Sequence, residues 1–217
     1  PDEIKRTQIQ ETIKEHFEKE RRLRPKGIKV LSLFFIDRVA SYAEDDGFIR
    51  KAFIEEFEEL KKDPVFGGII KDLDIDNIHN GYFARGSKGE AKDTNGSTKA
   101  DDEAYNLIMK DKERLLSLDE PLRFIFSHSA LREGWDNPNV FQICTLKNGG
   151  SEVRKRQEVG RGLRLCVNGD GQRMDRSFLG QDVHRVNTLT VIASESYESF
   201  VKGLQSEIAE DVFGKQS

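Results

Sequence analysis

The sequence has few cysteines and no long apolar run, and each shortage excludes a class of protein. Two cysteines, Cys144 and Cys166, in 217 residues cannot supply a disulfide framework, so we expect a cytoplasmic location. The longest apolar run, VLSLFFI, is much shorter than the roughly 20 residues of a membrane span, so no membrane partner is expected. The four histidines show no ligand spacing, so no metal site is expected.

Three motifs of nucleotide and nuclease chemistry are also missing. The chain contains no GxxxxGK[ST] segment, whose backbone amides cradle phosphates and whose hydroxyl holds magnesium. It has no DExH-type box and no PD…ExK pattern, because Asp119, Glu120 and Pro121 stand in the wrong order and lack an ExK partner. Any phosphate-binding loop or nuclease centre must therefore lie elsewhere.

The charge is ordinary in total and uneven in distribution. The net charge of −4 gives no overall positive field that would indicate nucleic-acid binding. Residues 44–76 hold eleven acidic and five basic side chains, whereas residues 145–176 hold eight basic and four acidic ones. A local basic face is therefore expected on an acidic protein. Because the chain opens at Pro1 with no targeting pattern, we expect a fragment of a longer protein.

Apolar runs alternate with amphipathic segments along most of the chain. This pattern predicts one α/β domain over residues 1–217, with a mostly parallel sheet and helices on both faces. Residues 72–102 are rich in Gly, Asn and charge, and we expect a surface excursion there, with a hairpin around Gly86–Gly89. Strands are predicted at 29–36, 122–127, 140–146 and 187–194, and helices at 1–26, 48–63, 103–116, 151–165 and 196–213.

The stretch QEVGRGLRL, residues 157–165, reads as a helix that contains two glycines. Each interior glycine costs about 1 kcal/mol relative to alanine, so a functional reason is expected for them. Gln157, Arg161 and Arg164 recur at helical spacing and present one amide and two forked guanidinium groups, which suit a phosphate. A solvated basic helix face is the alternative reading.

The loop SALREGWDNPN restrains a single carboxylate. Gly134 and Pro138 bracket Trp135 and Asp136 and predict a tight turn that presents Asp136 as a hydrogen-bond acceptor. A ribose hydroxyl is its natural partner beside a phosphate site. The alternative is an Asx turn in which Asp136 caps its own backbone.

Together, GWDNP, an apolar strand and QxxGRGxR resemble motifs V and VI of the second RecA-like domain in superfamily two helicases and translocases. Four further stretches, SLFFIDRVASY, GYF through TKADDEAY, FIFSHSALREGWDNPNVFQICTL and NTLTVIASESYESFVKGLQSEI, look like the restriction (Res) subunit of type III restriction-modification systems. The resemblance covers nearly the whole chain. It implies a RecA-like fold that lacks the P-loop.

The resemblance also implies roles for individual residues. Arg161 and Arg164 would be arginine fingers that stabilise charge on the transferred γ-phosphoryl group. The residues expected near the nucleotide are Gln157, Gly160, Gly134 and Asp136. The residues expected to border the nucleic-acid track are Asp37, Arg38, Ser127, His128 and Ser129. For His128, a hydrogen-bonded loop histidine is the alternative.

The cofactors and partners follow from the same resemblance. ATP and Mg²⁺ would be bound mainly by a first RecA-like domain, and S-adenosylmethionine would be bound by a methyltransferase (Mod) subunit that recognises double-stranded DNA. One departure is Glu133, where many relatives have arginine, so DNA-coupling contacts of that arginine are not expected here. Two other functions stay open: another superfamily two translocase, and a non-catalytic docking module.

Overall fold

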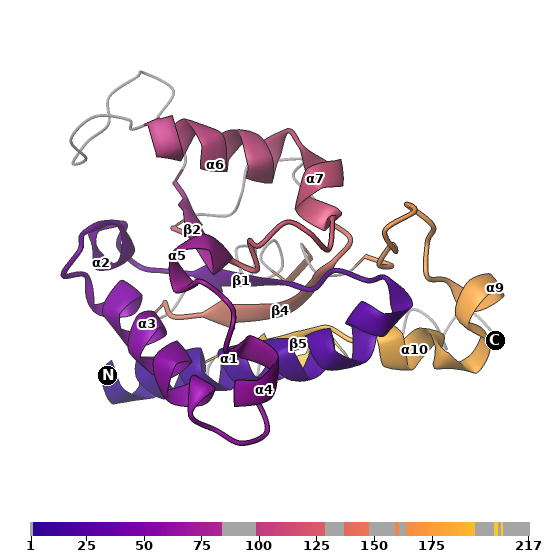
Figure 1. Ribbon diagram of the computed structural model, residues 1–217, viewed down its shortest axis with the longest axis horizontal. Coiled ribbons are helices and arrows are strands. Elements are labelled where there is room, and N and C mark those ends of the chain that lie inside the picture. The colour runs from indigo at the N-terminus through magenta and orange to yellow at the C-terminus, as the bar shows by residue number, and fades with distance from the viewer. Residues whose placement is uncertain are drawn as a thin grey trace.

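The computed structural model describes residues 2–83, 99–128, 137–147, 159–160, 164–193, 202–203 and 205. Within these residues, five strands form one parallel sheet in the order β2-β3-β1-β4-β5 (Figure 1). The strands are β1 Leu31–Phe35, β2 His79–Tyr82, β3 Phe124–Ser127, β4 Val140–Thr145 and β5 Thr190–Ile192. The predicted parallel α/β architecture is confirmed.

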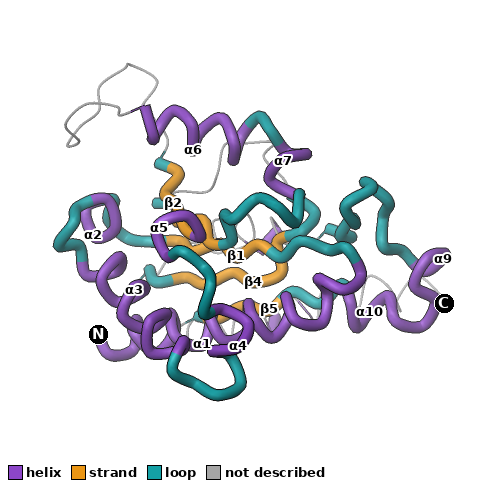
Figure 2. The backbone as a smooth tube through the Cα atoms, in the orientation of Figure 1, coloured by secondary structure: helices purple, strands orange, loops and turns teal. Residues whose placement is uncertain are grey.

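The three central strands are buried along their whole length and are mainly apolar because helices cover both faces of the sheet. All five residues of β1 are buried, and they alternate between the two faces. Phe34 faces α1 (Asp2–Leu23) and α3 (Phe48–Lys61), whereas Leu33 and Phe35 face α6 (Lys99–Met109) and α7 (Lys112–Leu116). Figure 2 shows the two helical layers on opposite sides of the strands.

Helix α1 forms as its sequence predicts and lies along the sheet. Acidic residues occupy its first turn and Arg21 and Arg22 its last, which complements the helix dipole. Ile9, Ile13 and Phe17, spaced four apart, are buried against the strands. The helix ends in η1 (Arg24–Lys26), and Gly27 follows with a φ of 72°, a conformation that favours glycine.

The polar region after α3 departs from the predicted surface excursion. Its described part contains α4 (Gly67–Ile70), α5 (Ile75–Ile78) and strand β2, and α6 already begins at Lys99. Strand β2 was not predicted from the sequence, because its residues, HNGY, are mainly polar or small. It lies at the edge of the sheet, where His79 and Tyr82 are buried, and pairs only with β3. The hairpin expected at Gly86–Gly89 lies outside the described residues.

Two predicted helices also differ in extent. The helix expected at 103–116 is divided into α6 and α7, because Asp111 ends one helix and caps the next by accepting from the Arg114 amide at 3.1 Å. Of the helix expected at 151–165, Val159 and Gly160 are helical, whereas Arg164 and Leu165 lie outside helical structure.

Short elements that the sequence did not predict precede β5. Val167 and Arg173 form an isolated antiparallel bridge, and α9 (Arg176–Leu179), η2 (Gly180–Asp182) and α10 (Val183–Val186) follow. A one-turn α2 (Ala40–Ala43) follows β1. The described residues of the expected 196–213 helix, 202–203 and 205, are helical. Among the helices described, none is long and apolar enough to cross a membrane.

Candidate functional site

The carboxyl ends of β1, β3 and β4 meet at one edge of the sheet. Phe35 pairs with Ser127 on one side and with Thr145 on the other. The loops that begin at Asp37, His128 and Lys147 therefore start side by side. In open parallel sheets, ligands bind at this carboxyl edge.

The predicted track residues have different environments at the carboxyl edge. Arg38 and His128 are exposed. The carboxylate of Asp37 is only partly exposed and pairs with Lys5 of α1 at 3.2 Å, so its charge is neutralised within the chain. The side chain of Ser127 is buried, and its carbonyl accepts from the Ile36 amide at 2.9 Å. The exposed side chains that a ligand can reach among these four are Arg38 and His128.

Sequence analysis missed Lys147, which also lies at this edge. Its ammonium group lies 5.4 Å from the centre of the Phe35 ring, within the range of a cation–π contact. The sequence could have predicted this position, because Lys147 directly follows the apolar strand VFQICTL and so stands at the strand end. Lys147 adds a positive charge where the loop after β4 begins, beside Phe35 of β1.

A buried aromatic contact holds the loop after β1 in place. The Tyr42 hydroxyl oxygen lies 2.6 Å from His79 Nδ1, and the Tyr42 ring stacks on Phe126 with centres 4.2 Å apart. Burial lowers the pKa of His79 to about 4 and raises the pKa of Tyr42. His79 is therefore neutral at pH 7, and its hydrogen bond with Tyr42 ties the loop that carries Arg38 to strand β2.

The described part of the QEVGRGLRL stretch shows one buried and three accessible positions. Val159 is buried, Gly160 is partly exposed, and Arg164 and Leu165 are exposed. A Cβ atom at Gly160 would meet no atom within 4 Å, so packing within the described chain does not require glycine there. The space beside Gly160 is thus open to another molecule or domain. Five predicted site residues lie outside the described residues: Gly134, Asp136, Gln157, Arg161 and Ser129.

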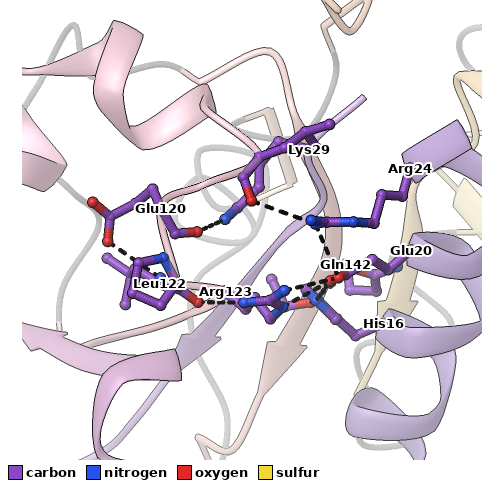
Figure 3. Close-up of polar contacts among 11 residues, drawn as sticks. His16, Glu20, Arg24, Lys29, Glu120, Leu122, Arg123 and Gln142 are labelled. Atoms are coloured by element: carbon purple, nitrogen blue, oxygen red, sulfur yellow. Dashed lines mark hydrogen bonds and ion pairs between the residues drawn. The ribbon is translucent and has the colours of Figure 1, made fainter. Parts of the chain in front are cut away.

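A polar cluster of histidine, serine and glutamate lies between α1 and the sheet, and Figure 3 labels its residues His16 and Glu20. The ring nitrogens of His16 lie 2.8 Å from Ser32 Oγ and 3.2 Å from Glu20 Oε2. These residue types also form hydrolase triads. Here, however, His16 and Ser32 have no exposed surface, so no substrate can reach the hydroxyl. The cluster is structural.

Glu20 is the centre of this cluster because Arg123 and Arg24 both pair with its carboxylate, Arg24 at 3.7 Å. Arg123 Nε and Nη2 both donate to its carboxylate at 2.9 Å, so the pair is bidentate and buried (Figure 3). Burial alone would raise the pKa of Glu20, but hydrogen bonds from His16 and Arg123 outweigh it and hold that pKa well below its usual range. Burial lowers the pKa of His16 to about 4, so His16 is neutral at pH 7. The cluster joins α1 to the start of β3.

Two buried lysines complete the polar framework. Lys19 donates to the carbonyls of Phe141 and Thr188, at 3.1 and 3.0 Å, and to Thr190 Oγ1 at 2.7 Å. Lys29 donates to the Glu120 carbonyl. Burial lowers the pKa of each lysine to about 8, so both remain mainly charged at pH 7.

The described residues contain no group of three His, Cys, Asp or Glu side chains that could hold a metal ion. The exposed guanidinium of Arg164 and the open space beside Gly160 do fit the approach of a nucleotide phosphate held by another domain.

Comparison with known proteins identifies relatives for most of the chain. No protein-family model matches the sequence. The chain is 43% identical to the EcoPI Res subunit of Escherichia phage P1 and 44% identical to the EcoP15I Res subunit of Escherichia coli, both type III restriction-modification enzymes, over 74% of this chain and 17% of each relative. It is 39% identical to the StyLTI Res subunit of Salmonella typhimurium, over 76% of this chain and 20% of that protein.

Among solved structures, domain 2 of the Mss116p DEAD-box helicase bound to an RNA duplex matches 93% of this chain and 56% of that chain. The TM-score is 0.43 and the identity 15%. The chain spans about a fifth of the length of the Res subunits, and the resemblance to them predicted from the motifs is confirmed over about three quarters of the chain.

Proposed function

We propose that this chain, which is similar to type III Res subunits over three quarters of its length, is the second motor domain of such a subunit. The observation that carries the proposal is 39–44% identity to three Res subunits. The proposed activity is ATP hydrolysis coupled to movement on duplex DNA, in an enzyme whose nuclease centre lies outside these residues.

The proposed contribution of this chain to ATP hydrolysis is positive charge at the transition state. Arg161 and Arg164 act as arginine fingers on the γ-phosphoryl group, and Gln157 contacts the phosphates. Such fingers are worth about 10³ to 10⁵ in rate in phosphoryl transfer. Gly160 lets the nucleotide and its domain come close, and the open space at this position supports that role.

Gly134 and Asp136 are proposed to bind on the ribose side of the nucleotide. The first RecA-like domain would hold ATP and Mg²⁺, which neutralises phosphate charge. Closure of the two domains would bring the arginines to the nucleotide, and hydrolysis would loosen the cleft.

The proposed DNA track follows the carboxyl edge of the sheet. Arg38 and His128 are exposed there, and Lys147 lies between the loops. Asp37 cannot attract phosphate by itself, but its pair with Lys5 positions the loop that carries Arg38. Backbone amides near Ser127 and Ser129 would contact phosphates without reading sequence. Site recognition is assigned to a Mod partner with S-adenosylmethionine.

The test is DNA-stimulated ATP hydrolysis by the full-length subunit assembled with its methyltransferase partner. Arg164→Ala and Arg161→Ala should each lower turnover by about two decades or more while nucleotide binding is preserved, because the interaction is made in the transition state. A matched control is Arg114→Ala, which removes an arginine that pairs with Glu120 at the opposite edge of the sheet. Unchanged turnover in both arginine variants would refute the arginine-finger role.

A further inference from the structure

The geometry points to a second surface for duplex DNA. It lies at the amino ends of the strands, whereas the proposed track lies at their carboxyl ends. We define the amino-edge basic surface by seven exposed cations: Arg21, Arg22, Arg24, Lys26, Arg173, Arg176 and Arg185. The inference rests on the proposed function only for the identity of the partner, duplex DNA.

This surface concentrates positive charge on an acidic protein. Residues 21–26 and 168–186 hold these seven cations against three aspartates, whereas the whole chain holds 35 Lys and Arg against 39 Asp and Glu. Two of the aspartates are engaged: Asp175 caps α9, and Asp182 lies 3.9 Å from Arg185. The local excess of positive charge is therefore not cancelled within these segments.

The two segments are held together, so their charges act on one ligand. The Gly169 amide donates to the Gly27 carbonyl at 2.8 Å, which fixes the 168–172 turn against η1. Asn187 accepts from the Cys166 amide and donates to the Met174 carbonyl, both at 2.8 Å. Figure 1 shows α9 and α10 at the end of the sheet where α1 ends.

A small apolar core supports the amino-edge basic surface from below. It joins residues of α1, the strand starts and the 166–186 segment, namely Leu23, Ile28, Val30, Phe141, Cys166, Met174 and Val186. The backbone that carries these charged side chains is therefore held by a packed core. This lowers the entropy cost of ordering the segments when a ligand binds.

Most of these cations are available to a ligand. Arg22, Lys26, Arg173 and Arg176 form no ion pair with any other described residue. Arg21 pairs with Glu18 at 2.8 Å, but the Arg21 side chain is exposed and that of Glu18 is partly exposed, and such surface pairs contribute little.

The contrast with the carboxyl edge favours a phosphate backbone as the ligand. In the described part of the carboxyl edge, Lys5 is neutralised by Asp37 and Lys147 lies against Phe35. The affinity of a protein for DNA comes mainly from phosphates neutralised by Lys and Arg. The amino-edge basic surface offers more such groups than the described carboxyl edge, and six of its seven cations are arginines, which bind phosphate through two donors.

The test measures binding of a fluorescein-labelled duplex of mixed sequence to the full-length protein, by anisotropy, without nucleotide and over a salt titration. The variant is Arg22→Ala with Arg173→Ala and Arg176→Ala. We expect affinity at about 0.1 M salt to fall about tenfold or more, and the slope of log affinity against log salt to fall by about 3, because each lost phosphate contact removes about 0.9.

The matched control is Lys51→Ala with Lys62→Ala and Lys71→Ala, which removes the same charge from an exposed region elsewhere and should leave the salt slope unchanged. A second variant, Phe178→Ala, removes the exposed aromatic side chain beside Arg176, which a protein partner would use. Binding of duplex should be unaffected by Phe178→Ala.

Three outcomes overturn the inference. They are an unchanged slope in the triple arginine variant, an equal loss in the lysine control, and a loss of partner assembly without a loss of DNA affinity. ATP hydrolysis without DNA should be normal in the triple arginine variant. The two proposals therefore fail in different measurements. Failure of this inference appears in DNA affinity and its salt dependence, whereas failure of the proposed arginine fingers appears in the rate of ATP hydrolysis.

Discussion

The two edges of one sheet are built in different ways. At the carboxyl edge, loops begin side by side and present a few exposed polar groups, such as Arg38 and His128. Towards the amino edge, buried charged side chains pair beneath the exposed cations of the amino-edge basic surface, as in the contact between Glu20 and Arg123. The difference indicates that stability is concentrated where the strands begin, which leaves the loops at the strand ends open to ligands.

The largest expected stability effect is the loss of the buried ion pair. Glu20→Gln leaves the Arg123 guanidinium buried without a counter-charge, and breaking such a pair costs about 3–5 kcal/mol. Urea unfolding of this chain measures the loss. Glu18→Gln, on the same helix, breaks the exposed pair with Arg21 and should cost less than about 1 kcal/mol. Equal costs for the two substitutions would show that burial of the pair between Glu20 and Arg123 adds nothing to its contribution to stability.

The next effect is a dependence of stability on pH that arises in the same cluster. The pKa of His16 is about 4 in the folded chain and about 6.5 when unfolded, so the unfolded state binds more protons between these values. Stability should therefore fall as the pH drops from about 6.5 to 4, by on the order of 3 kcal/mol from this group.

Unfolding free energies measured across that pH range test this prediction. His16→Gln removes the titrating group, so the decline should be shallower than in the wild type. If the two pH profiles are parallel, His16 does not cause the decline. His128→Gln is the matched control, because His128 is exposed at the other edge.

The smallest stability effect is expected at the carboxyl edge. Arg38→Ala removes an exposed side chain and should change the unfolding free energy by no more than about 0.5 kcal/mol. DNA stimulation of ATP hydrolysis by the full-length enzyme should nevertheless fall, because the proposed track loses a cation. A large loss of stability, with DNA stimulation intact, would assign Arg38 to the framework instead.

The elements that could be predicted from the sequence are those determined by the pattern of neighbouring residues. Strands β1, β3 and β4 were predicted because they are buried on both faces and therefore mainly apolar. Strand β2 was missed because HNGY has no apolar run and owes its place to pairing with β3. The break between α6 and α7 depends on one cap, Asp111, inside a helical pattern.

The candidate site was predictable only in part for the same reason. Strand ends place Asp37 and His128 at one edge, but the pairing of Asp37 with Lys5 joins residues 32 apart in sequence. The burial of Lys19 and Glu20 could not be predicted from the sequence, because the stretch around them has the pattern of an exposed, charged helix surface. Their partners lie more than 100 residues away, at Phe141 and Arg123.

The Lys19 contacts also bear on the order in which the protein folds. Lys19 lies in the first helix, yet its acceptors include Thr188 and Thr190, up to 171 residues later. During synthesis at about 5–20 residues per second, the first helix must wait on the order of ten seconds or more for these acceptors. Until then its ammonium group remains in water. Strand β5 therefore joins the sheet and buries the lysine in one late step, which should make folding slow relative to proteins rich in local contacts.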